Sequence, residues 1–204
     1  MATATASRRE PVQARSRRTV TRILDAAAAI ADEQGVEAAT TRAVADRAGV
    51  SYPSLYRFFA DRDAIFDELL TRHCNEIDAR CIEAEQTWTV TSFADLFNKE
   101  IDLHVEYYRK HPSSARLWMG GRTSPAVTKH VRIRMQTLAN RLHGILVDAG
   151  LIPVDIDPLN MLVAVEMADR LLELSYRDNN DFDETILTIG RTALVAFGEA
   201  LAGS

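Results

Sequence analysis

Apolar residues recur every three or four positions along most of this chain, which is the spacing of amphipathic helices. No stretch shows the strict alternation that marks a half-buried strand. The spacing predicts helices over about residues 18–35, 41–48, 52–59, 61–81 and beyond, 93–111, 127–145, 157–174 and 182–201, with a short apolar piece at 117–119. We therefore predict an all-α fold.

Start and stop signals divide these helices from one another. Thr40 or Thr41, then Ser51, and then Asp61 are predicted to cap helix N-termini, with Pro53 in the first turn after Ser51. Gly49 falls where the second helix has to end. The interval between the second and third helices is then so short that the two helices must cross steeply.

The composition fits a folded protein built from long helices. Hydrophobic residues make up 47% of the 204 positions and charged residues 26%, with only nine glycines and six prolines. Two cysteines are too few to stabilise a secreted domain through disulfide bonds, so we expect a cytoplasmic protein. No apolar run approaches the roughly 20 residues that span a bilayer, and we expect neither a signal peptide nor a membrane partner.

Charge is distributed unevenly along the chain. The net charge is −5, yet residues 1–22 carry six arginines against the single acid Glu10. Residues 1–70 are neutral, with ten bases and ten acids, whereas residues 71–204 hold 14 bases and 19 acids. This distribution predicts a flexible basic arm over residues 1–17 that approaches a polyanion. The alternative is a solvated tail with no partner.

The most specific motif in the sequence is the segment TTRAVADRAGVSYPSLYRFFADRD, residues 40–63. It predicts a helix, a tight turn, a second helix and a capped third helix, which is the arrangement of a helix-turn-helix. The predicted small core comprises Val44, Ala48, Val50, Leu55 and Phe59. Ser51, Tyr52, Ser54 and Arg57 then lie on the outer side of the second helix, where they can contact bases and phosphates.

The turn AVADRAGVS, the aromatic cluster LYRFF and the sequence FFADRDAI make the chain resemble the TetR family of bacterial transcriptional regulators over about residues 18–70. The resemblance implies an N-terminal three-helix DNA-binding domain at 18–63 and a larger C-terminal helical bundle at 64–204 for effector binding and dimerisation. It further implies a homodimer on double-stranded operator DNA, without a cofactor. The implied function is a repressor released from a palindromic operator by a small hydrophobic ligand.

The resemblance also assigns roles to residues of the first domain. It implies that Thr41 and Arg42 contact phosphates, and that Tyr56 donates its hydroxyl to one. Arg62 stands where the family usually places lysine, and Phe58 stands where histidine or tyrosine is more common. With the arm included, the predicted DNA-binding residues are Arg17, Arg18, Thr41, Arg42, Ser51, Tyr52, Ser54, Tyr56, Arg57 and Arg62.

Motifs of catalysis and metal binding are missing from the sequence. There is no nucleophile elbow, no phosphate-binding lysine loop and no dinucleotide-binding glycine pattern. The histidines show no i, i+4 pairing, so we predict neither an enzyme nor a metal site. Cys74 and Cys81 are seven residues apart on one helix and too distant to bridge. They are interpreted as buried structural thiols, with a redox switch as the alternative.

The second domain is predicted to hold a ligand cavity, because aromatic, methionine and polar side chains share its apolar faces and the resemblance implies a cavity there. The predicted lining residues are Phe97, His104, Tyr108, Trp118, Met135, His143 and Glu166. Their apolar character in an acidic domain favours a hydrophobic effector that is neutral or cationic. The alternative is a solid core with constitutive repression.

The last two helices carry apolar stripes too wide for one core, which predicts that two copies pair into a four-helix interface. The predicted interface residues are Leu162, Ile186, Ile189, Gly190, Ala193, Ala196 and Phe197.

Two other classes of function stay open at this point. One is a helical protein-interaction module, which would show no salt-dependent duplex binding, and the other is an α-helical enzyme. Repressor and activator are not distinguished by sequence.

Overall fold

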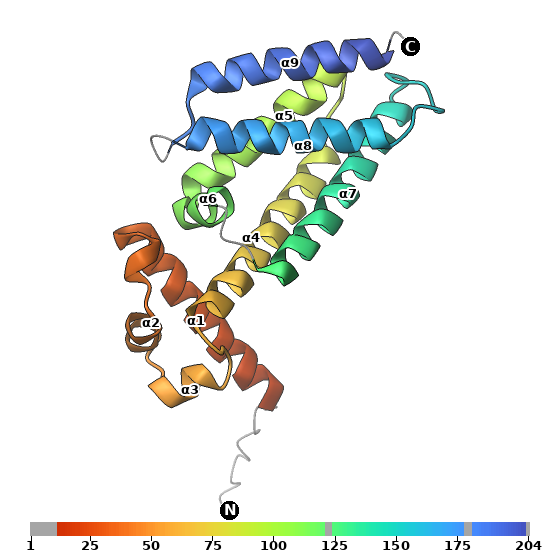
Figure 1. The fold of residues 1–204 in the computed structure, drawn as a ribbon. Helices are drawn as coiled ribbons and strands as arrows, with labels where there is room; N and C mark the ends of the chain where they lie inside the picture. Colours follow the sequence, from red (N-terminus) through yellow and green to blue (C-terminus); the bar gives the residue numbers. More distant parts are fainter. Residues whose placement is uncertain (1–11, 121–123, 178–180, 203–204) are drawn as a thin grey trace, which may run out of the picture. The chain divides into compact units, whose positions relative to one another are not determined.

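A computed structural model describes residues 12–120, 124–177 and 181–202 of the protein (Figure 1). Within those ranges the chain is helical and contains no strand, which confirms the predicted all-α class. The elements in chain order are α1 (Val12–Gln34), η1 (Val36–Ala38), α2 (Thr41–Ala48), α3 (Tyr52–Tyr56), α4 (Arg62–Glu85), α5 (Phe93–Lys110), α6 (Pro112–Met119), α7 (Pro125–Asp148), α8 (Leu159–Tyr176) and α9 (Glu184–Ala202).

The chain divides into two compact units, Met1–Leu69 and Leu70–Ser204, with the division inside α4. Helix α1 begins at Val12, although the sequence predicted a start near Arg18, so residues 12–17 of the predicted arm are helical. Residues 1–11 of that arm lie outside the described residues. None of the described helices is both long and apolar enough to cross a membrane.

Capping side chains set the boundaries in the first unit. Thr40 accepts a hydrogen bond from the Ala43 amide at 3.2 Å and Asp61 accepts one from the Ala64 amide at 2.8 Å, which confirms these two caps. The third predicted cap is wrong, because the Ser51 side chain makes no capping hydrogen bond at the start of α3. Helix α3 ends at Tyr56, three residues before the predicted end. Beyond Tyr56 the amides of Arg57 and Phe58 bond to carbonyl oxygens three residues back, those of Ser54 and Leu55, so the regular α-helical pattern is lost.

In the second unit, α8 packs against both α7 and α9, and α9 also packs against α5 (Figure 1). Two glycines of α9 permit this close packing. A Cβ at Gly190 would lie 2.8 Å from a methyl carbon of Leu171 on α8, and one at Gly198 would overlap the Phe93 ring. Gly190 was predicted to serve contacts between two copies, but it is buried within its own chain.

Two ion pairs join α4 to α7 inside this unit. Arg134 donates through Nε to Oδ1 of Asp78 at 2.8 Å, and Arg141 donates through Nε to Oε2 of Glu85 at 2.6 Å. Both pairs span 56 residues of sequence, so the two helices run parallel and in a fixed register. The two pairs therefore hold α7 against α4 beside the cavity described below.

Candidate DNA-binding surface and ligand cavity

The turn between α2 and α3 is built on a left-handed glycine. Gly49 has φ +61° and closes α2, a conformation that a residue with a Cβ adopts only under strain. Arg22 of α1 donates to the carbonyl oxygens of Ala48 and Gly49, the latter at 3.0 Å. An arginine from the supporting helix therefore satisfies carbonyl groups that the end of α2 leaves open.

The residues beneath this turn form the predicted small core. Val44, Ala48, Leu55 and Phe59 are buried, and Val50 is half-buried. Because this core fixes the crossing of the two helices, it also determines which side chains of α3 remain on the surface.

Three hydroxyl groups meet on the exposed side of α2 and α3. The Tyr52 and Tyr56 hydroxyls lie 3.0 Å apart, and Thr41 Oγ1 lies 3.2 Å from the first and 3.4 Å from the second. The two tyrosines are 47% and 43% exposed and their rings meet edge to face. Hydrogen bonds from Thr41 and then from Tyr56 lower the pKa of Tyr52. We call Thr41, Tyr52 and Tyr56 the hydroxyl cluster.

Most of the remaining predicted DNA-binding residues are also accessible. Arg17, Arg18, Arg42, Ser51 and Arg57 are exposed. Ser54 is half-buried beside Leu55 and is therefore less accessible than the others.

Arg62 has partners within its own unit. Its guanidinium donates to the Val36 carbonyl oxygen at 2.7 Å and to Glu37 Oε2 at 3.1 Å, and it lies over the Phe66 ring at 5.0 Å. These bonds tie the start of α4 to the short helix η1. Arg62 therefore has a structural role that the sequence did not reveal, beside the phosphate contact predicted for it.

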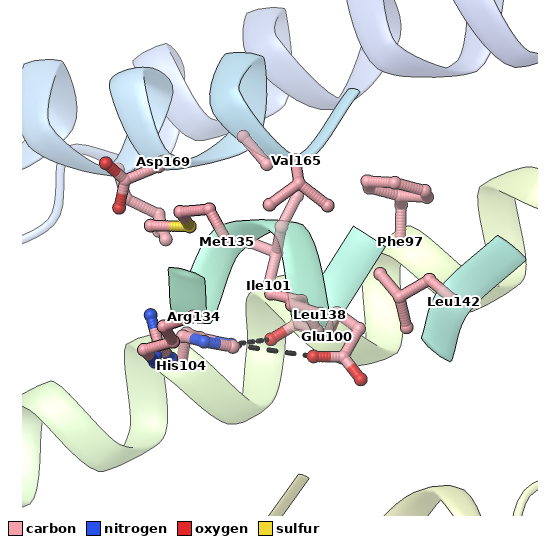
Figure 2. Close-up of a pocket in the computed structure, with 12 residues that line it drawn as sticks. Phe97, Glu100, Ile101, His104, Arg134, Met135, Leu138, Leu142, Val165 and Asp169 are labelled. Atoms are coloured by element: carbon pink, nitrogen blue, oxygen red, sulfur yellow. Dashed lines mark hydrogen bonds and ion pairs between the residues drawn. The ribbon is translucent and has the colours of Figure 1, made fainter. Parts of the chain in front are cut away.

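The second unit contains a small cavity of about 40 Å³ between α5, α7 and α8. Figure 2 shows His104, Arg134 and Asp169 on one side of it and Phe97, Val165 and Leu142 on the other. The lining residues are Phe97, Glu100, Ile101, His104, Arg134, Met135, Leu138, Leu142, Val165, Ala168, Asp169 and Leu172. The cavity is thus polar at one end and apolar at the other.

Three of the seven residues predicted to line a cavity do so, namely Phe97, His104 and Met135. Tyr108 is buried beside His104, with ring centroids 6.3 Å apart, but does not line the cavity. Trp118 stands behind the lining and donates to Asp169 Oδ1 at 2.8 Å.

The other two predicted residues are not brought to the cavity. The His143 ring lies 3.2 Å from the Ile156 carbonyl oxygen, in the segment that leads to α8. Glu166 is exposed on α8.

Burial changes the ionisation of the polar lining. Burial, and then the neighbouring Glu85, raise the pKa of Glu100 to about 8. Burial, and then the charge of Arg134, lower the pKa of His104 to about 4. Burial also raises the pKa of Asp169, against the opposing effect of the Trp118 hydrogen bond. Near neutral pH the cavity therefore presents a neutral imidazole beside a largely protonated Glu100.

Sequence reasoning missed Glu100, Arg134 and Asp169. Glu100 lies three residues after Phe97 and Arg134 lies four residues before Leu138, so helical spacing alone puts both on apolar faces. A charged residue in such a position is the signal that could have found them, because a buried charge needs a partner.

The outer faces of α8 and α9 carry exposed apolar side chains. On α9, Ile189 is 63% exposed, and Ala193 and Ala196 share its face at i+4 and i+7. Ile186 and Phe197 on α9 and Leu162 on α8 are half-buried. The predicted interface residues other than Gly190 therefore remain at least partly accessible in the single chain.

Comparison with known proteins gives the same assignment for the first unit. The sequence pattern of "Bacterial regulatory proteins, tetR family" matches residues 23–69. The transcriptional repressor KstR of Mycobacterium tuberculosis is 48% identical over 59 residues, which are 29% of this chain and 27% of KstR. KstR of Rhodococcus jostii is 44% identical over 59 residues, or 29% of this chain and 28% of that protein. The match thus spans only about a quarter of each relative.

Solved structures extend the similarity to both units, over about nine-tenths of the chain. FadR from Bacillus subtilis, solved in complex with stearoyl-CoA, superposes with a TM-score of 0.66 at 17% identity, covering 87% of this chain and 97% of FadR. A TetR-family transcriptional regulator from Streptomyces coelicolor superposes with a TM-score of 0.63 at 30% identity, covering 90% of this chain and 99% of that protein. With the helix-turn-helix, the all-helical second unit and this relative in agreement, the chain belongs to the TetR family of bacterial transcriptional regulators.

Proposed function

We propose that the protein is a homodimeric repressor that binds a palindromic operator and leaves it when a small hydrophobic ligand enters the cavity of the second unit. The hydroxyl cluster is the observation that carries the DNA-binding part. Its three hydroxyls are exposed, close together and able to donate to phosphates or base edges.

The positive charge needed for a duplex lies in the same unit. Arg17 and Arg18 on α1, Arg42 on α2 and Arg57 after α3 are exposed. Contacts of this kind give affinity that falls steeply with salt. The relatives named KstR are transcriptional repressors and match this chain over 59 residues, which favours repression over activation.

A single α3 of five residues reads only a few base pairs, so specificity requires a second copy on a second half-site. The exposed stripe at Ile189, Ala193 and Ala196 offers an apolar surface for that copy. A two-fold dimer places the same patch on both partners and matches an inverted repeat in the DNA.

The cavity supports an effector with a polar and an apolar end. A volume of about 40 Å³ accommodates water but no organic molecule, so a ligand has to bind a wider state of α5, α7 and α8. The FadR structure contains stearoyl-CoA in a protein of the same fold. In this chain Glu100 is largely protonated and Arg134 is paired with Asp78, so the polar lining carries little net charge, which favours a neutral polar end of the ligand.

Helix α4 gives the cavity a route to the DNA-binding unit. It starts at Arg62, directly after the helix-turn-helix, and its later residues Asp78 and Glu85 hold Arg134 and Arg141 of α7. A ligand that moves α7 therefore pulls on α4. It shifts the protein between states only as far as it binds one state better than the other.

Selection of bound duplexes from random DNA tests the DNA-binding part. The expected product is an inverted repeat whose half-sites lie on one face of the DNA, about one helical turn or somewhat more apart. Sedimentation of the complex should show two chains per duplex. Recovery of an asymmetric half-site bound by one chain would contradict the proposal.

A thermal-shift screen tests the ligand part, with neutral apolar compounds, hydrophobic amines and fatty acyl-CoA thioesters as separate classes. Hits should raise the melting temperature and lower affinity for the selected operator. Hits that stabilise the protein and leave operator affinity unchanged would refute the switch. Trp118→Ala, which removes the ring behind Asp169, should change which compounds are hits.

A further inference from the structure

Three metal-ligating groups converge in the core of the second unit. The Sγ of Cys81 on α4, a carboxylate oxygen of Glu100 and an imidazole nitrogen of His104 on α5 all lie within 4.8 Å of one another. All three residues are buried. They come from two helices, and Glu100 and His104 are one helical turn apart, so their convergence is a property of the fold.

Neither carboxyl oxygen of Glu100 makes a hydrogen bond of normal geometry among the described residues, although the Glu85 carboxyl and the Cys81 thiol lie close enough to shift its pKa. Both of its oxygens are buried, and Oε2 lies 3.7 Å from Nδ1 of His104, which is beyond hydrogen-bond distance. The same Nδ1 lies 2.8 Å from the main-chain oxygen of Glu100 and donates a hydrogen bond to it (Figure 2), so an ion binds this ring through Nε2 or after Nδ1 gives up that bond. A buried carboxyl without a partner is costly, so this group must be neutralised by a proton or by a cation.

The neighbouring charges leave room for a cation. Arg134 is paired with Asp78, and Arg141 is paired with Glu85, so the two arginines and two acids cancel one another. A thiolate on Cys81 and a carboxylate on Glu100 carry two negative charges, which one divalent ion balances. Binding then releases to solvent the thiol proton and any proton on the carboxyl.

We propose that Cys81, Glu100 and His104 bind one divalent transition-metal ion of the zinc class. One sulfur, one nitrogen and one oxygen donor are typical of zinc or cobalt(II), whereas magnesium and calcium take oxygen ligands. Glu100 and His104 also line the cavity, which is large enough for a water molecule as a fourth ligand. This site is independent of the DNA-binding function proposed above.

The sequence pattern alone argued against a metal, because no two histidines share the i, i+4 spacing. Glu100 and His104 do share that spacing, but the third group comes from another helix. The proposal therefore replaces the expectation that the chain has no metal site.

Cobalt(II) titration of the full-length, chelator-treated and desalted protein tests the site. The expected result is one ion per chain, with the charge-transfer absorption of a cobalt–thiolate bond, displaced by zinc. Cys81→Ser should abolish that absorption and weaken binding at least 100-fold, and Glu100→Gln should weaken binding at least 10-fold. Cys74→Ser is the matched control: it changes another buried thiol seven residues earlier on α4, and it should bind like the unaltered protein.

Absence of cobalt binding, or equal binding by Cys81→Ser, would overturn the proposal and leave a proton as the occupant of Glu100. X-ray absorption of the zinc-loaded, unaltered chain keeps the test independent of variant folding. It should show one sulfur at about 2.3 Å with nitrogen and oxygen ligands at about 2.0–2.2 Å. A zinc spectrum without a sulfur ligand would also overturn the proposal.

Discussion

Arg134 and Asp78 form an ion pair that joins the wall of the cavity to the helix that leads out of the DNA-binding unit. The guanidinium of Arg134 is buried against α4, with Nε 2.8 Å from the Asp78 carboxylate, and it also lies over the Trp118 ring at 5.4 Å. One residue thus contacts the cavity, α4 and α6 at once. A ligand near Arg134 cannot displace it without disturbing α4.

Asp78→Asn should destabilise the protein strongly, because it leaves the Arg134 guanidinium buried without its counter-charge. Loss of one member of a buried pair costs about 3–5 kcal/mol. Thermal and urea unfolding measure the effect. Glu83→Gln removes an exposed acid from the same helix and should change the unfolding free energy by less than about 0.5 kcal/mol. Equal stability of the two variants would show that the pair is not needed.

Gly49→Ala should destabilise the protein by about 1–2 kcal/mol, because alanine is strained at φ +61°. The added Cβ would also lie 2.9 Å from Nη2 of Arg22 and disturb its bonds to the turn. Gly144→Ala on α7 meets no atom within 4 Å and should be neutral or stabilising by up to about 1 kcal/mol. Chemical denaturation of both variants checks the contrast, and a neutral Gly49→Ala would contradict the strain argument.

The hydroxyl cluster predicts different effects for its two tyrosines. Tyr56→Phe removes one hydroxyl and should weaken binding to all duplexes by a similar factor, whereas Tyr52→Ala removes a predicted base-reading ring and should change sequence preference. Competition binding measures both effects: each altered protein is offered the selected operator and duplexes that differ from the operator at one base pair. If Tyr52→Ala lowers affinity uniformly, Tyr52 contacts the DNA backbone and not the bases.

Glu100 and His104 predict a decline of stability with rising pH in metal-free protein. Glu100 has a folded pKa of about 8 against its usual 4.5, so the folded state holds a proton that the unfolded state releases over that window. His104 has a folded pKa of about 4 against its usual 6.5, which gives the opposite slope between those values. The two slopes cancel from about pH 4.5 to 6.5. Stability should then fall by roughly 1–2 kcal/mol between pH 6.5 and 8.

Urea unfolding at each pH, with a chelator present, checks this prediction. Glu100→Gln should remove the decline above pH 6.5. His104→Gln should extend the decline down to about pH 4.5, because the opposing slope is gone. An unchanged pH dependence in Glu100→Gln would contradict the assignment.

Ala193→Glu should give monomers or insoluble protein, because it places a charge in the exposed apolar stripe beside Ile189. Thr188→Glu puts the same charge on another exposed face of α9 and should leave the dimer intact. Analytical ultracentrifugation distinguishes the two. An undisturbed dimer in Ala193→Glu would place the interface elsewhere.

The starts of two helices were predictable because they depend on local chemistry, whereas the start of α1 and the end of α3 were not. Thr40 and Asp61 cap the helices that their positions indicated, since a cap needs only a side-chain oxygen within three residues of a free amide. The polar partners in the core were not predictable in this way. Asp78 and Arg134 are 56 residues apart, and helical spacing shows that each faces inward but not which groups it meets. The same limit hid the approach of Cys81 to His104.

The hydroxyl cluster also affects how the protein discriminates between its operator and other DNA sequences. Thr41, Tyr52 and Tyr56 already bond to one another in the free chain, so a phosphate or base acceptor that takes the proton of one of these hydroxyls replaces an existing bond. Contact is thus an exchange with little net gain, unless the duplex engages two or three hydroxyls together. A random sequence that engages one gains almost nothing and dissociates quickly. Discrimination is therefore expected to lie in residence time, with encounter rates similar for operator and random DNA.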